Sequence, residues 1–142
     1  MGIQFKQLAD SSLGLEGSGL DTGSFIFINI PYNTTSPLTL SSSVLPRAAV
    51  VQAIYAVPDV AATNAVTATV YKAASGTALG SGTALHSGTV NLQGTAATNL
   101  VPTLSTTTGA LLVAAGNRIG VVISGALGAS GSGVVTVALT PA

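Results

Sequence analysis

Histidine is the first side chain to consider for chemistry, and this 142-residue chain has only one, His86. A catalytic triad would need its imidazole beside an activated serine and an acid, and a metal site would need at least one more strong ligand. Asp59 is the only acid after residue 22, and nothing in the sequence brings it close to His86. We therefore expect His86 to be a structural histidine, in a turn or at the surface, and we expect no metal site.

One string looks catalytic, Asp21-Thr22-Gly23, because aspartic proteases use an Asp-Thr-Gly signature from each of two subunits to hold two aspartates that share a proton. Such proteases present this string after an apolar strand. Here Gly17-Ser18-Gly19 precedes it, and no convincing apolar-apolar-Gly partner follows downstream. We interpret Asp21 as an ordinary loop aspartate, so the sequence predicts a protein that is not an enzyme.

The charge and the cysteine content of the chain exclude further classes of function. The chain has four Lys and Arg, four Asp and Glu, no Cys and a formal net charge of zero. Without a basic cluster it lacks the phosphate-neutralising groups that nucleic-acid binding needs, and without Cys it has neither disulfides nor thiolate sites. The Gly-rich string Gly80-Ser81-Gly82 lacks the lysine of a phosphate loop. We expect no cofactor and no nucleic-acid partner.

The composition is 47% hydrophobic and only 6% charged. No run approaches the roughly 20 apolar residues of a spanning helix, so no membrane partner is expected. Because Ser, Thr, Asn, Gly and Ala must cover the surface, the composition favours a protein packed against copies of itself or a partner. The first ten residues, MGIQFKQLAD, lack the apolar region of a signal peptide, which predicts synthesis in the cytoplasm without export.

Alternating apolar residues predict strands over most of the chain. Residues 111–124 read as strand, turn at 114–117, and strand, which predicts an antiparallel hairpin with Ile119, Val121 and Ile123 on one face. Further strands are predicted at 24–30, 48–57, 65–73 and 134–140, the first of them buried on both faces. A long polar connection is expected at 36–46.

Gly-Thr recurs every six residues, at positions 76, 82, 88 and 94. Four hexapeptides are too few for a stable parallel β-helix, so we interpret them as short strands separated by glycine bends, with Val90 and Leu92 pointing inward. Many short strands with frequent turn signals and no amphipathic helix predict an all-β fold. We expect an antiparallel β-sandwich, jelly-roll-like, at residues 23–142, with an extended N-terminal arm at residues 1–22.

The C-terminal two-thirds of the chain resembles a known group of proteins. The succession VTATVYKAASGTALGSGTALHSGTVNLQGTAATNL, LLVAAGNRIGVVISG and GVVTVALTP is similar to small virion proteins of tailed bacteriophages, notably capsid decoration (cement or head-stabilisation) proteins and head-fibre base domains. The resemblance spans roughly residues 48–142. It implies a β-sandwich or jelly-roll domain, often a homotrimer, that lies on the capsid exterior and ties neighbouring capsomers together, with the major capsid protein as partner.

These expectations define a candidate interface rather than an active site. The arm carries three of the four acids against one lysine, and its leucines could clip onto the capsid or adjacent copies, while the first strand's aromatic side chains pack in the core or at a subunit seam. The candidate residues are Leu8, Leu13, Leu15, Leu20, Phe25 and Phe27. The alternative is a receptor- or carbohydrate-binding β-sandwich module from a phage fibre or an adhesin.

Overall fold

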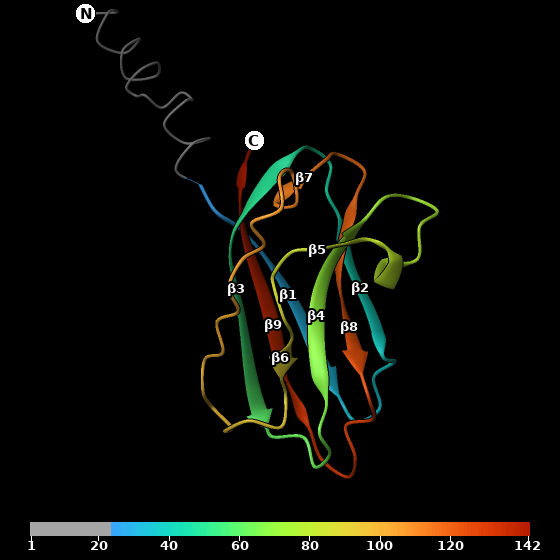
Figure 1. The fold of residues 1–142 in the computed structure, drawn as a ribbon, viewed down its shortest axis with the longest axis vertical. Helices are drawn as coiled ribbons and strands as arrows, with labels where there is room; N and C mark the ends of the chain where they lie inside the picture. The colour runs from blue at the N-terminus through green and yellow to red at the C-terminus, as the bar shows by residue number, and fades with distance from the viewer. Residues whose placement is uncertain (1–23) are drawn as a thin grey trace, which may run out of the picture.

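Two antiparallel β-sheets packed face to face make up the part of the chain that the structure describes, residues 24–142 of a computed structural model (Figure 1). The arm expected at residues 1–22 lies outside the described residues. The elements are β1 Ile26–Asn33, β2 Thr39–Val44, β3 Ala49–Val60, β4 Thr67–Ala73, the 3-10 helix η2 Leu79–Ser81, β5 Thr83–Ala84, β6 Val90–Asn91, β7 Leu112–Val113, β8 Arg118–Ser124 and β9 Ser132–Pro141.

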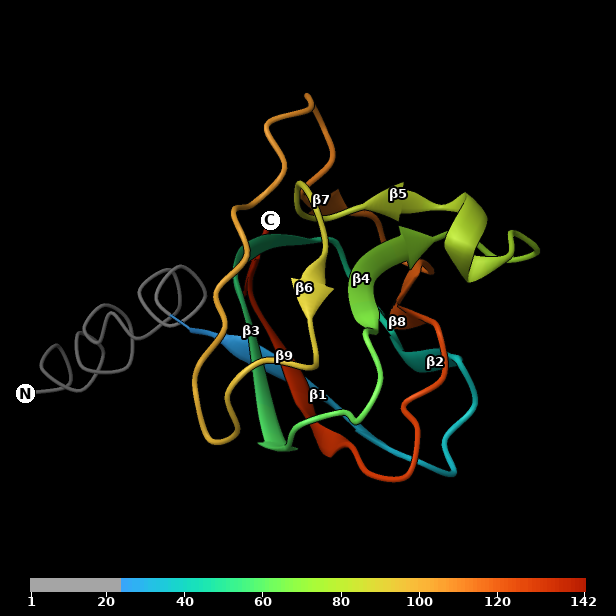
Figure 2. The ribbon, with the colours of Figure 1, turned by 60° about the horizontal axis from the view of Figure 1, so that its bottom comes forward.

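The strand order confirms the jelly-roll prediction. Sheet A has the order β1-β9-β3-β7, and sheet B has the order β2-β8-β4-β5 with β6 also paired to β4. The first strand pairs with the last, β2 with β8, β3 with β7 and β4 with β6, all antiparallel. This nested pairing is that of one long hairpin rolled into a sandwich. Figure 2 shows the two layers from one end.

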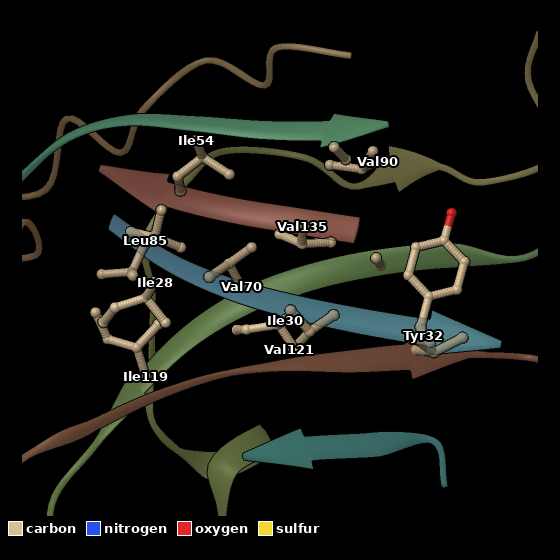
Figure 3. Close-up of a cluster of buried hydrophobic side chains, with 14 of the residues drawn as sticks. Ile28, Ile30, Tyr32, Ile54, Val70, Leu85, Val90, Ile119, Val121 and Val135 are labelled. Carbon is tan, nitrogen blue, oxygen red and sulfur yellow. The ribbon is translucent and has the colours of Figure 1, made fainter. Parts of the chain in front are cut away.

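The core lies between the inner faces of the two sheets (Figure 3). From sheet B it takes Ile119, Val121 and Ile123, each at most 2% exposed, as their alternation predicts. Sheet A contributes the β9 residues Val135, Val137 and Leu139, which are equally buried. Val90 and Leu92 also point inward as expected. The sheets are therefore held together mainly by branched aliphatic side chains.

The predicted hairpin at residues 111–124 is wrong in its pairing. The turn exists, with Gly116 at a φ of +85° and the Asn117 amide donating to the Ala114 carbonyl. However, the strand before it, β7, pairs with β3 in sheet A, whereas β8 pairs with β2 and β4 in sheet B. The turn carries the chain from one sheet to the other instead of reversing it within one.

Three further expectations about the N-terminal part of the fold are corrected. β1 is buried on one face only, since Ile28 and Ile30 lie in the core while Phe25 and Phe27 are 53% and 60% exposed. The strand also continues through Pro31, which is tolerated because β1 lies at the edge of sheet A and the missing N–H breaks no ladder. The connection expected at residues 36–46 contains β2, an edge strand whose serines conceal its pattern.

Close packing at one point of sheet A depends on a glycine. Gly133 in β9 lies between Tyr32 in β1 and the Val57–Pro58 segment of β3. A Cβ at Gly133 would lie 2.2 Å from the Val57 carbonyl oxygen and 2.8 Å from the Tyr32 hydroxyl. That hydroxyl is buried without a hydrogen-bond partner among the described residues. Burial, with a smaller contribution from the charge of Asp59, raises the pKa of Tyr32 to about 12.

We predict that Gly133→Ala destabilises the protein strongly, because a backbone carbonyl cannot move aside as a flexible side chain can. Overpacking of this kind costs about 1–3 kcal/mol or more. The matched control is Gly80→Ala, since the nearest atom to a Cβ at Gly80 is the Val122 Cγ2, 3.8 Å away. Chemical denaturation measures both variants, and an unchanged midpoint for Gly133→Ala would contradict the packing described.

Candidate interaction surface

His86 is a buried structural residue. Its Nε2 accepts a hydrogen bond of 3.0 Å from the backbone amide of Val70 in β4, which places the ring proton on Nδ1, 3.3 Å from the Ser87 carbonyl oxygen. The side chain is 3% exposed. Burial lowers the pKa of His86, and the Ser87 carbonyl opposes that shift. The imidazole therefore links the segment after β5 to β4. The sequence placed His86 in a turn or at the surface, and the second of these expectations is wrong because the side chain is buried.

The cations of sheet B also serve the fold. The Lys72 Nζ donates to the carbonyl oxygens of Gly109 at 2.7 Å and Leu112 at 2.5 Å, and desolvation lowers its pKa. The Arg118 guanidinium donates to the carbonyls of Ala74 and Thr77. Both side chains link loops to strands through hydrogen bonds to carbonyl oxygens. Because their N–H groups are used in this way, they do not indicate an anion-binding site.

Nothing in residues 24–142 assembles a metal or catalytic cluster from acids, histidine and cysteine. No group of three or more such side chains gathers anywhere in that range. Asp21 of the Asp-Thr-Gly string lies outside the described residues. The same range contains no helix with the length and apolar character needed to cross a bilayer.

The outer face of sheet A is the surface that stands out, because it carries aromatic side chains and no core covers it. Strand register places Phe27 of β1 opposite Ala138 of β9, and Ala138 opposite Ala53 of β3. The next row along the strands runs from Asn29 through Thr136 to Tyr55, which is 40% exposed. Ala53 and Ala138 thus have Phe27 beside them in their own row and Tyr55 in the next row.

A β-bulge in β3 shapes this face. Val51 pairs with Leu139 and Ala53 with Ala138, so Gln52 is an extra residue in the ladder. The bulge shifts the alternation, and Gln52 and Ala53 both face outward while Val51 and Ile54 are both buried. The Gln52 Nε2 donates to the Thr140 Oγ1 at 2.9 Å, which fixes this amide at the rim.

The result is a shallow hollow of about 400 Å³, which we call the aromatic groove. The Phe25 and Phe27 rings stack at its β1 side, with centroids 6.0 Å apart and planes 20° from parallel. Its lining residues all lack charge: Phe25, Phe27, Gln52, Ala53, Tyr55 and Ala138. In Figure 1, β3 and β9, two of the strands that bear it, lie to the left of β4 and β8. Its chemistry suits apolar side chains.

A second hollow, of about 300 Å³, lies between β6 and the segment 99–102. The bridge between Ala56 and Leu100 places that segment beside β3, so Val101, 62% exposed, adds to the apolar surface near Tyr55. Its lining mixes amides with apolar groups: Thr89, Val90, Asn91, Asn99, Leu100, Val101 and Pro102. This hollow is less aromatic than the groove.

Two of the six candidate residues from the sequence line the groove. Phe25 and Phe27 are brought together by the structure, and the expectation that they pack in the core of the chain is wrong because both are exposed. Leu8, Leu13, Leu15 and Leu20 lie outside the described residues. The other four lining residues were not predicted, because only strand register and the bulge bring them to the groove: Gln52, Ala53, Tyr55 and Ala138.

Comparison with known proteins identifies the fold. The chain is similar to a phage capsid chain. That chain belongs to the capsid asymmetric unit of cyanophage Pam1, with a TM-score of 0.55 and 19% sequence identity over 94% of this chain and 96% of that one. At this identity the likeness establishes a shared architecture. No protein-family model matches the sequence, and neither does any curated protein.

We predict that protonation of His86 destabilises the fold. Because its folded pKa lies below the unfolded value of 6.5, the unfolded chain takes up the proton first. The free energy of unfolding is therefore highest above that value. It falls as the pH drops below about 6.5, by up to about 1.4 kcal/mol per pH unit for one proton. Thermal unfolding from pH 5 to 7 measures this, and His86→Gln should flatten the profile. An equal slope in both proteins would refute the assignment.

We predict very different losses of stability when two adjacent β1 side chains are truncated. Phe27→Ala removes an exposed ring and should change the free energy of unfolding by less than about 1 kcal/mol. Ile28→Ala empties a core position and should cost about 2–5 kcal/mol. Denaturant titration compares the two, and similar losses would mean that Phe27 is covered within the folded chain.

Proposed function

We propose that this chain is a structural virion protein that decorates the outer surface of a tailed-phage capsid and stabilises it through non-covalent contacts. It acts without catalysis, as a homotrimer, with the major capsid protein as its partner. The observation that carries this proposal is the architectural likeness, over 94% of the chain, to a chain of the cyanophage Pam1 capsid asymmetric unit.

The surface chemistry supports a role in assembly. Apart from the cations held by loop carbonyls, the described residues carry few charges, and the outer face of sheet A exposes Phe25, Phe27, Tyr55 and Val101. Exposed apolar surface of this kind is removed from water when another protein covers it, which favours binding. Many weak contacts repeated by the symmetry of a shell then hold each copy in place without any single strong site.

Specific residues follow from this proposal. Phe25 and Phe27 would contribute to the contact with the capsid or a neighbouring subunit, since they lie exposed on an uncharged face. Leu8, Leu13, Leu15 and Leu20 would supply further apolar anchors in the assembled particle. Synthesis would take place in the host cytoplasm, and the final location would be the capsid exterior.

A second candidate function rests on the aromatic groove. Three of the five aromatic side chains in residues 24–142 line it, next to the Gln52 amide. Aromatic faces beside an amide can also bind a sugar, so the groove would suit a receptor- or carbohydrate-binding module of a fibre or adhesin. The absence of tryptophan from the chain makes this the weaker fit.

We predict that the purified full chain co-sediments with mature heads assembled without it and saturates at a fixed number of copies per capsomer. Bound heads should resist heating better than bare heads. Phe27→Ser should weaken binding, whereas Val44→Ser, a substitution of an equally exposed side chain on sheet B, should not.

Absence of binding to the heads would refute the decoration role. Binding of the isolated chain to glycans or host cells, lost in Phe27→Ser, would instead support the receptor-binding candidate. Sedimentation of the free chain tests the trimer separately, since a monomer that still saturates the heads would refute only the oligomeric state.

A further inference from the structure

The first strand, β1, forms an open edge of sheet A. In the sheet order β1-β9-β3-β7, β1 pairs with β9 on one side and with no other strand of the described chain on its other side. Its register with β9 is unbroken over all eight residues, Ile26–Asn33. Backbone N–H and C=O groups along such an edge can pair with a further strand.

The backbone groups of alternate β1 residues point away from β9. At the end of the strand the Asn33 amide donates to the Ser36 Oγ at 3.0 Å, and the Asn33 carbonyl accepts a hydrogen bond from the Ser36 amide, so both groups face the turn. Successive residues of an antiparallel strand direct their backbone groups to opposite sides. Pro31, Asn29 and Phe27 therefore face the open edge, as Asn33 does.

The far side of the sheet gives the same assignment. Ala56 in β3 exchanges both of its backbone hydrogen bonds with Leu100, so Ala56 faces away from β9. Its β9 partner, Val135, must then direct its groups to the other neighbour, β1, where it lies opposite Ile30. Since Ile30 faces β9, the adjacent Asn29 faces the open edge.

The other sheet edges in residues 24–142 are covered or irregular. Beyond β3 lie β7 and the segment of Leu100, and beyond β4 lie β5 and β6. The outer side of β2 is open, but its register with β8 shifts between Ser41 and Val44. Irregularities of this kind turn an edge away from pairing. Within that range β1 therefore offers the regular open edge.

The usual protection of an open edge is also missing from β1. Natural sheets place lysine, other charges or bulges on an edge to prevent pairing between copies. The β1 sequence, IFINIPYN, has no charged residue, and its register has no bulge. The Asn29 side chain leaves the edge clear, because its Oδ1 accepts a hydrogen bond of 2.8 Å from the Thr136 Oγ1 of β9. Along the edge, only Pro31 lacks a backbone donor.

We propose that β1 pairs antiparallel with β1 of a second copy of this chain, about a two-fold axis at Ile28. Phe27 of each copy then lies opposite Asn29 of the other, and each of these two pairs forms two backbone hydrogen bonds. Phe25 lies opposite Pro31, so the missing N–H falls at the ends of the paired segment. The two four-stranded A sheets join into one sheet of eight strands.

The exposed phenylalanines add an apolar contact to this pairing. Phe25 and Phe27 of one copy already stack and are both exposed. In the proposed register the two Phe27 residues are diagonal neighbours, about 7–8 Å apart, which is within reach of aromatic side chains. The rings of both copies then form one cluster and remove part of their faces from water. A two-fold contact places the same surface on both sides, and the uncharged β1 edge brings no like charges together.

This contact goes beyond the proposed virion role and is separate from the proposed trimer. Three-fold symmetry repeats a head-to-tail contact and does not place one strand edge opposite itself. The pairing is a property of the free chain and is measured without capsids, so it and the decoration role can fail separately.

The absence of cysteine from the chain allows the pairing to be mapped by disulfides. Full-length Phe27→Cys and Asn29→Cys are each oxidised mildly alone and as an equimolar mixture. Opposite residues in a hydrogen-bonded pair have Cα atoms about 5.5 Å apart, which suits a disulfide, whereas the diagonal pairs available to each single variant are about 7–8 Å apart. The control mixes Asn29→Cys with Val101→Cys, because Val101 is as exposed as Phe27 but lies beyond β3.

We expect the mixture of Phe27→Cys and Asn29→Cys to form an intermolecular disulfide at least tenfold faster than either variant alone or the control mixture. Non-reducing electrophoresis and mass spectrometry identify the products. A single variant that crosslinks as fast as the mixture would overturn the register about Ile28. A control mixture as fast as the edge mixture would overturn the contact itself.

A second variant tests the contact without cysteine. Phe27→Lys removes the aromatic contact and puts a positive charge on the edge of each copy. At concentrations where the parent chain associates, we expect the mean mass in sedimentation equilibrium to fall towards half, since each two-fold contact joins two copies. Val101→Lys should leave the mass unchanged. An unchanged mass for Phe27→Lys, or a parent chain that does not associate, would overturn the proposal.

Discussion

The burial of two apolar sheet faces against each other is the constraint on which the rest of the structure depends. Ile119, Val121 and Ile123 from β8 meet the inward side chains of β9 and β3, and these side chains leave almost no surface exposed. Since Asp59 is the only acid after residue 22, the described body has little scope for ion pairs. Its cohesion comes from apolar packing and from the backbone ladders that this packing keeps dry.

Polar side chains form hydrogen bonds with backbone groups that lie next to the core. His86 accepts a hydrogen bond from a backbone amide of β4, and Lys72 and Arg118 donate hydrogen bonds to loop carbonyls. Each of these bonds lowers the free-energy cost of placing polar backbone beside the core. On the outer face of sheet A, the bulge at Gln52 leaves a groove between aromatic side chains.

Strand alternation could be read from the sequence because it depends only on neighbouring residues. The buried set in β8 is correct for that reason, and so is the all-β class. The sheet that a strand joins after a turn could not be predicted in this way. Gly116 is compatible both with a reversal within one sheet and with a crossing between two sheets. β2 was hidden because Ser41, Ser42 and Ser43 on an edge strand carry no apolar alternation. The groove depends on Phe27, Ala53 and Ala138 lying side by side, a register that no local pattern specifies.

The pairing of β1 with β9 also means that the two ends of the described body are neighbours, with Ile26 opposite Leu139. A short loop joining Ala142 to Ser24 would turn these strands into a hairpin and leave every sheet contact in place. The exposed stretch 106–109 could then serve as a new pair of ends. Circular permutation of the body should therefore preserve its architecture.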